Sequence, residues 1–142
     1  MITNIDHVAL SVASLDRSIT FYRDVIGFEV ARILECGPEM RLGDVNGMPG
    51  STARIAHLTL GETMLELFEY LTPQGKPIPP DHKQADNGLI HMGLASTDAR
   101  ADYEKLKEND VKFLCEPIEF RPGVWIFYFY GPDGEVCELR ES

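Results

Sequence analysis

The sequence predicts an α+β fold of two βαβββ modules, because three features of its first half return in its second half in the same order. A histidine lies near the start of an alternating run at residues 6–12 (DHVALSV) and again at residues 88–96 (GLIHMGLAS). Each run precedes an amphipathic helical pattern and then β-rich segments that contain a glutamate. Each module alone would leave a curved sheet half covered. We therefore expect the modules to pair about a pseudo-twofold axis, with their concave faces forming a cleft.

The chain has 142 residues, which is enough for one domain with a buried core or for two very small domains. We expect one domain spanning residues 1–142, with modules at about 1–71 and 88–142. The segment between them, residues 72–87, is rich in proline and polar residues and is predicted to be the linker.

The first module is predicted as a strand, a helix and three further strands. Alternation in residues 4–12 places the polar or small His7, Ala9 and Ser11 on one face of the first strand. Ser14 is suited to cap the helix, and Gly27 is suited to end it. We expect the remaining strands at residues 28–34, 54–60 and 63–70, the last two joined at a tight turn, and a long loop at 35–52.

The second module is predicted to repeat this order. We expect a strand at residues 89–95, a helix capped by Asp98, and a strand at 111–115. After a loop at 119–123, the run VWIFYFY at 124–130 is strongly β-prone, and a GPDG turn leads to the last strand at 135–140.

Composition excludes several classes of function. The net charge is −10 with no basic cluster, which argues against nucleic-acid binding. No apolar run approaches the roughly 20 residues that cross a bilayer, and the N-terminus MITNID lacks a secretory pattern, so we expect a cytoplasmic protein. Cys36, Cys115 and Cys137 are widely spaced without a CxxC pair. They are expected to be reduced thiols, with Cys137 opposite Glu138 as a packing residue.

Four residues stand at matching places in the two halves. His7 and His91 lie on the first strand of each module, and Glu66 and Glu138 lie on the last. Two imidazoles and two carboxylates suit one divalent cation such as Zn²⁺, Ni²⁺, Co²⁺, Fe²⁺ or Mn²⁺. Any one of them alone is more often an ordinary core or surface group. Agreement in strand order and repeat position favours the metal site.

Several segments together resemble the vicinal oxygen chelate superfamily, which includes glyoxalase I, methylmalonyl-CoA epimerase, extradiol dioxygenases and the fosfomycin and bleomycin resistance proteins. The segments are DHVALSV, FYRDVIGFE, MLELFEY, LIHMGLAS and, most specifically, YGPDGEVCELRE, and they span nearly the whole chain. The resemblance implies that His7, Glu66, His91 and Glu138 are the four metal ligands. Extradiol dioxygenases use two histidines and one glutamate, whereas Glu66 fills the fourth place found in glyoxalase I and epimerase types.

The resemblance therefore implies a metal-dependent lyase or isomerase that transfers a proton through an enediolate. Glu138 is expected to be the main base, with Glu66 able to serve the other face of the intermediate. Alternatively, both glutamates are ligands only, and another residue or water is the base. Two other functions stay open: an Fe(II)-dependent extradiol-type dioxygenase, and a non-catalytic resistance-type protein that binds a small molecule.

Recognition of a small-molecule substrate is assigned to arginine and apolar side chains. An anionic group could be bound by Arg121, Arg41 or Arg54, and apolar walls could come from Met64, Phe68, Trp125, Phe127 and Phe129. His57, without a glutamate partner in the repeat, and His82, in the linker, are not expected to be ligands. Family members commonly form homodimers, and the modules could pair within one chain or between two.

Overall fold

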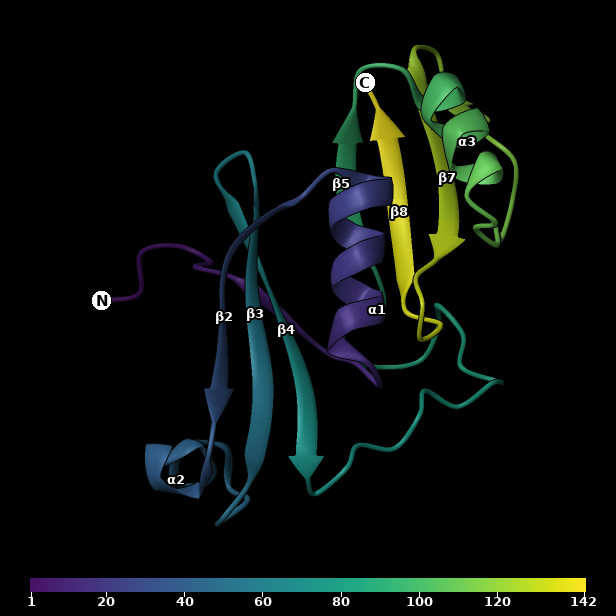
Figure 1. Cartoon of the computed structure of the whole chain (residues 1–142). Coiled ribbons are helices and arrows are strands. Elements are labelled where there is room, and N and C mark those ends of the chain that lie inside the picture. The colour runs from purple at the N-terminus through teal and green to yellow at the C-terminus, as the bar shows by residue number, and fades with distance from the viewer. The chain divides into compact units, whose positions relative to one another are not determined.

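The computed structural model describes all 142 residues and divides them into two compact units, Met1–Pro77 and Ile78–Ser142. Each unit contains one four-stranded sheet, and a helix packs against strands of that sheet (Figure 1). The α+β class and the two βαβββ modules predicted from sequence are thereby confirmed. The boundary between the units falls inside the segment predicted to be the linker. The pairing of the modules as one domain stays a prediction.

The first unit has the strand order β1-β4-β3-β2, with β1 parallel to β4 and the other neighbours antiparallel. Its elements are β1 (Val8–Ser11), α1 (Leu15–Thr20), the π-helical turn η1 (Phe21–Ile26), β2 (Glu29–Cys36), the 3₁₀ turn η2 (Pro38–Met40), α2 (Leu42–Asn46), β3 (Thr52–Leu60) and β4 (Thr63–Thr72).

The second unit has the same arrangement, with the order β5-β8-β7-β6 and β5 parallel to β8. Its elements are β5 (Met92–Ser96), α3 (Ala99–Glu108), β6 (Ile118–Arg121), β7 (Val124–Tyr130) and β8 (Val136–Glu141). No helix of the structure combines the length and the apolar character needed to span a membrane.

The helices begin in the same way in both units. The predicted caps Ser14 and Asp98 each accept a hydrogen bond from a backbone N–H in the first turn. A glutamate from the last strand accepts a second one: Glu69 Oε2 from Leu15 N at 2.8 Å, and Glu141 Oε2 from Ala99 N at 2.8 Å. Two orphan N–H groups per helix are satisfied in this way. The repeat thus includes the contacts that fix each helix to its sheet.

Two predicted segments differ from the structure. Residues 111–115 do not form a strand: Phe113 makes only an isolated bridge to Phe129. Instead β6 forms later, overlapping the predicted loop at 119–123, as a hairpin with β7. The turn of this hairpin contains Gly123 at φ 78°, which favours glycine. The predicted loop at 35–52 contains the short helical turns η2 and α2, which are separated by Arg41 in a left-handed conformation.

Candidate functional site

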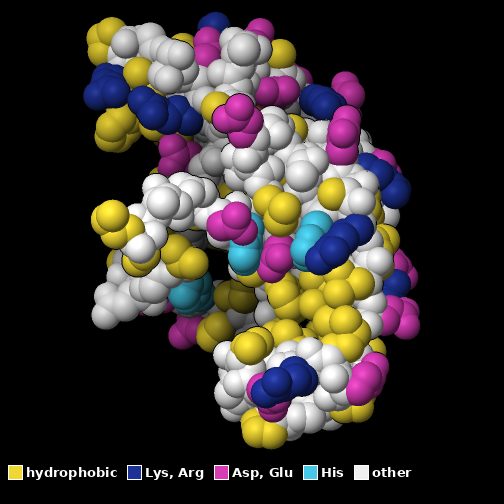
Figure 2. Space-filling view, turned by 90° about the vertical axis from the view of Figure 1, so that its left-hand side faces the viewer, with side chains coloured by type: hydrophobic (Ala, Val, Ile, Leu, Met, Phe, Trp, Pro, Cys, Tyr) yellow, Lys and Arg dark blue, Asp and Glu magenta, His cyan; other side chains and the backbone are white.

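Glu66 lies between two histidines on one face of the first sheet. Its register partner on β1 is Ala9 and its register partner on β3 is His57. His7, two residues before Ala9, places Nε2 3.3 Å from Glu66 Oε2, and His57 places Nε2 3.1 Å from Glu66 Oε1. Each carboxylate oxygen therefore faces one imidazole. Figure 2 shows on one face of the molecule an acidic side chain between two histidines, with a basic side chain beside them.

The hydrogen bonds of the two imidazoles give them opposite roles. His7 Nδ1 lies 2.8 Å from Asp6 Oδ2, and because a carboxylate only accepts, this nitrogen is the donor. Neutral His7 therefore keeps its lone pair on Nε2, the atom that faces Glu66. In contrast, His57 Nδ1 accepts from Arg32 Nε at 3.2 Å, so the hydrogen of neutral His57 is on Nε2.

The second unit repeats the first contact with different supporting groups. His91 Nε2 lies 2.9 Å from Glu138 Oε2, and His91 Nδ1 lies 2.9 Å from Gln84 Oε1. The amide of Gln84 is oriented by a second bond, from its Nε2 to Ile90 O at 3.0 Å. An amide oxygen and a carboxylate both only accept, so a neutral ring can donate to one of them only. With its hydrogen on Nδ1, as in His7, the Nε2 lone pair of His91 faces Glu138.

Tyr128 stands where His57 stands in the first unit. It is the register partner of Glu138 on the neighbouring antiparallel strand, and its ring centre lies 5.0 Å from that of His91. Burial, the charge of Glu138 and a hydrogen bond to Glu138 raise the pKa of the Tyr128 hydroxyl. Tyr128 is therefore a neutral donor to Glu138 near pH 7.

The pKa of His7 is also raised. The largest cause is its hydrogen bond to Asp6, opposed by desolvation and assisted by the charges of Glu66 and Asp6. The effect is moderated by solvent, because the His7 side chain is 39% exposed. Protonation of His7 would engage its Nε2 with Glu66, whereas the neutral form leaves that nitrogen available as a ligand.

The histidines predicted as ligands fit a divalent cation in their donor chemistry. Metal-binding histidines almost always donate their second N–H to an oxygen acceptor, which fixes the tautomer, and His7 and His91 both do so. No group of three or more histidine, cysteine or acidic side chains is arranged to hold a cation in the structure. Within each unit the glutamate is instead paired directly with its histidine. The four-ligand assignment stays a prediction.

The aromatic residues predicted as pocket walls divide between the two faces of their sheets. Phe127 and Phe129 are fully buried, and Phe127 contacts Tyr103 of α3, so these two belong to the core. Trp125 has the same strand parity and stacks on Arg100 of α3 at 4.6 Å, away from the face that carries Glu138. These three side chains thus lie on the face of the second sheet opposite Glu138, and a role of Trp125 in substrate binding stays a prediction.

On β4, Phe68 shares the face of Glu66 by alternation, as does Met64. Phe68 stacks on Tyr70 with ring centres 5.8 Å apart, beside the buried cluster of Cys36, Ala53 and Ile55. This apolar surface adjoins the row of polar groups at Glu66.

The arginines predicted to bind an anion differ in their surroundings. Arg54 is paired with Asp16, Glu35 and Glu69, and these contacts support the start of α1. Arg41 pairs with Asp44 in the α2 segment. Arg121 ends the edge strand β6 and is exposed, and its role in substrate binding stays a prediction.

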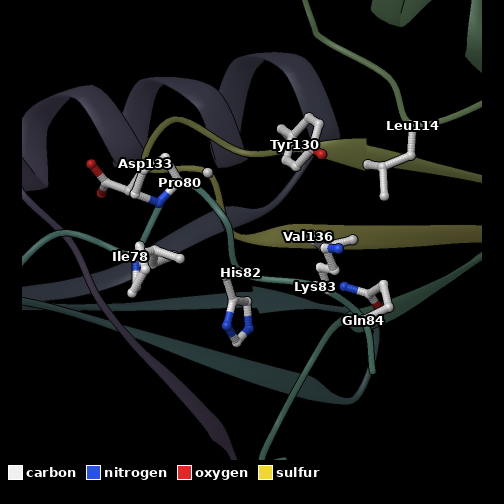
Figure 3. Close-up of a pocket in the computed structure, with 11 residues that line it drawn as sticks. Ile78, Pro80, His82, Lys83, Gln84, Leu114, Tyr130, Asp133 and Val136 are labelled. Atoms are coloured by element: carbon white, nitrogen blue, oxygen red, sulfur yellow. The ribbon is translucent and has the colours of Figure 1, made fainter. Parts of the chain in front are cut away.

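A cavity of about 450 Å³ lies within the second unit (Figure 3). Linker residues 78–84 and residues around the β7–β8 turn line it, including His82, Gln84, Tyr130 and Asp133. His82 is paired with Asp86 at 3.3 Å. Gln84 connects this cavity to the ligand candidate His91 through the hydrogen bond described above.

Sequence reasoning missed the groups that surround the predicted ligands. A signal for His57 was present: a two-residue turn pairs the strands in a register that puts His57 opposite Glu66. His57 therefore lies beside Glu66 in the folded chain, and the expectation that it is not a ligand stays a prediction. Gln84 could not be found in this way, because its contact with His91 depends on the path of an irregular linker.

Comparison with known proteins defines the family. Residues 4–139 match the glyoxalase/bleomycin resistance protein/dioxygenase superfamily. The chain is 37% identical over 148 residues to a 2-epi-5-epi-valiolone epimerase from an Actinomyces species, covering 95% of this chain and 77% of that protein. It is 30% identical over 140 residues to metallothiol transferase FosB from Staphylococcus epidermidis, covering 98% of this chain and 82% of that protein.

The fold agrees with this relationship. A glyoxalase family protein from Bacillus cereus superposes with a TM-score of 0.89 at 22% identity, covering 99% of this chain and 95% of that one. The chain belongs to the glyoxalase/bleomycin resistance protein/dioxygenase superfamily, which confirms the resemblance to vicinal oxygen chelate proteins. Both relatives named above are enzymes.

Proposed function

We propose that this protein is a metal-dependent epimerase or lyase that moves a proton beside a carbonyl group of a small substrate. In this proposal His7 and Glu66 from one unit and His91 and Glu138 from the other hold one divalent cation. The units would supply these ligands from one chain or from two copies in a homodimer. Membership of the superfamily and similarity to an epimerase support the class of reaction.

One observation carries the proposal. In each unit, an oxygen acceptor engages Nδ1 of a histidine while Nε2 of the same ring lies within 3.3 Å of a glutamate carboxylate. A neutral imidazole with its hydrogen on Nδ1 has its ring lone pair on Nε2. The glutamate supplies a hard anionic oxygen beside that nitrogen. Nitrogen and oxygen donors together suit Zn²⁺, Ni²⁺, Co²⁺, Fe²⁺ or Mn²⁺.

The bound cation would act as a Lewis acid on substrate oxygens and so acidify the neighbouring C–H group. The chain would provide the group that carries the proton. We assign this role to Glu138, because the Tyr128 hydroxyl donates to it and can turn about its C–O bond as the carboxylate gains or loses a proton. Glu66 could take the same role on the opposite face of a planar intermediate, as an epimerase requires.

The experiment combines metal analysis with an exchange assay. Purified protein is analysed for metals, reloaded with Co²⁺, Ni²⁺, Zn²⁺, Mn²⁺ or Fe²⁺, and incubated in D₂O with 2-epi-5-epi-valiolone, with methylmalonyl-CoA and with the hemithioacetal of methylglyoxal. We expect metal-dependent incorporation of deuterium beside a carbonyl in one of them. Oxygen consumption with a catechol would instead indicate a dioxygenase. Stoichiometric binding without turnover would indicate a binding protein.

A further inference from the structure

We propose that Arg32 and His57 form a positioning pair that fixes the carboxylate of Glu66 so that one of its oxygens is reserved for the cation. The proposal deepens the function proposed above, and it rests on that function for the role of Glu66 as a ligand. Neither Arg32 nor His57 is assigned contact with the substrate or the cation.

The pair belongs to a row of side chains that crosses the sheet of the first unit. Arg32 on β2 is the register partner of His57 on β3, which in turn is the register partner of Glu66 on β4. The contacts are continuous: 3.2 Å from Arg32 Nε to His57 Nδ1, then 3.1 Å from His57 Nε2 to Glu66 Oε1. Figure 2 shows a basic, a histidine and an acidic side chain adjoining in this order on one face of the molecule.

Hydrogen-bond chemistry determines which group donates and which accepts at each contact in this row. The Nε–H of arginine can only donate, so His57 Nδ1 must accept and the ring hydrogen must be on Nε2. That hydrogen is the one available to Glu66 Oε1, which lies 3.1 Å from Nε2. The His57 and Glu66 side chains are each only 15% exposed, which limits competition from water for this contact.

As a consequence, the two carboxylate oxygens of Glu66 have different roles. Oε1 is held by His57, whereas Oε2 faces His7 Nε2 at 3.3 Å. Oε2 is therefore the oxygen presented for binding a cation, and Glu66 would bind it through one oxygen. His57 is excluded as a competing ligand, because its Nε2 carries the hydrogen and its Nδ1 accepts from Arg32.

The first test measures the His57 tautomer by nitrogen-15 NMR in the metal-free protein near neutral pH. We expect the ring hydrogen on Nε2, because Nδ1 accepts from Arg32, and we expect Arg32→Met to give a mixture of tautomers. A His57 ring that is doubly protonated, or that carries its hydrogen on Nδ1, in the unsubstituted protein would overturn the proposal. This measurement does not depend on whether the protein binds metal or turns over a substrate.

The second test measures the affinity for Co²⁺ and the visible spectrum of the Co²⁺ form. Loss of a group that orients a metal ligand typically lowers metal affinity 10–100-fold, and we expect His57→Leu to do so and to alter the spectrum. His57→Gln keeps an N–H donor and should restore most of the affinity. His82→Leu is the matched control, since His82 pairs with Asp86 and not with Glu66.

The outcomes separate this proposal from the proposed function. If the unsubstituted protein binds no cation, the proposed function fails, and the tautomer measurement alone decides the positioning pair. If it binds Co²⁺ and His57→Leu binds it equally tightly with the same spectrum, the positioning pair is wrong and the proposed function stands. Thermal unfolding of each variant shows whether a loss of affinity reflects a loss of fold.

Discussion

The two units place a histidine and a glutamate at equivalent backbone positions but support them with different side chains. Opposite Glu66 stands His57, an imidazole held on its far side by Arg32, whereas opposite Glu138 stands Tyr128. The His57 ring has contacts on both sides and therefore restricts the orientation of the Glu66 carboxylate. The Tyr128 hydroxyl can rotate as the Glu138 carboxylate moves. The comparison indicates that the duplicated glutamates have diverged, with Glu66 suited to a ligand role and Glu138 to proton transfer.

The two histidines, His7 and His91, also differ in the side chains that support them. His7 is bonded to its sequence neighbour Asp6, which is 83% exposed, while His91 is bonded to Gln84 from the linker, whose amide is itself oriented by Ile90 O. A neutral amide fixed by two contacts constrains a ring more than an exposed carboxylate does. The second unit therefore holds its histidine more firmly, and the first unit holds its glutamate more firmly.

The largest expected effect distinguishes the catalytic roles of Glu138 and Glu66. Glu138→Gln should lower kcat/KM by about 10²- to 10⁴-fold, the usual contribution of a proton-transferring group. Glu66→Gln should lower it less, because an amide oxygen can still accept from His57 and bind a cation. Steady-state kinetics on metal-loaded proteins of equal metal content checks this. Equal losses in the two variants would refute the division of roles.

The next effect concerns the partners of the histidines. Gln84→Met removes the acceptor for His91 Nδ1 at similar volume, and we expect metal affinity to fall about 10–100-fold. Asp6→Ala should reduce it by a smaller factor, because the contact of Asp6 with His7 is exposed. Titration calorimetry with Zn²⁺ compares the two variants. A greater loss for Asp6→Ala would reverse the assignment of the firmer histidine.

A third prediction uses the raised pKa of Tyr128. Burial is the largest cause and the Glu138 carboxylate adds to it, so Glu138→Gln should bring this pKa part of the way down towards 10. Because the folded state favours the neutral phenol, the stabilisation from Tyr128 is fully present below pH 10 and is lost as pH rises through its raised pKa. Carbon-13 NMR of labelled tyrosine follows the titration. Ionisation of Tyr128 before the other tyrosines would contradict the hydrogen bond to Glu138.

The smallest effect tests the equivalence of the helix starts. Ser14→Ala and Asp98→Ala should each cost about 1 kcal/mol of the free energy of unfolding, the typical contribution of a capping side chain. Urea unfolding monitored by circular dichroism provides the values. An unchanged free energy in either variant would show that the glutamate from the last strand is a sufficient cap in that unit.

Much of the fold could be predicted because it depends on local signals. Alternation, the caps Ser14 and Asp98 and the terminating Gly27 predicted the strand and helix order of both modules, and structure confirms it. The strand expected at 111–115 failed because β-prone composition does not specify a partner, and most of that segment lies outside regular pairing with β7.

The candidate site was predictable only in its repeated residues. The surroundings of those residues depend on register and on the linker, so Tyr128 and Gln84 gave no sequence signal. The position of Trp125 has a similar cause: which face of β7 it occupies depends on how the GPDG turn sets the register of Tyr128 against Glu138. One residue of slip would have exchanged the two faces.

The central claim is tested most directly by the number of cations bound per chain. Titration of the metal-free protein with Co²⁺ should give one tightly bound ion per chain. His7→Ala and His91→Ala, one from each unit, should each abolish that binding while the thermal unfolding of the metal-free protein stays unchanged. Two ions per chain, or tight binding that survives His91→Ala, would contradict a single cation held by both units.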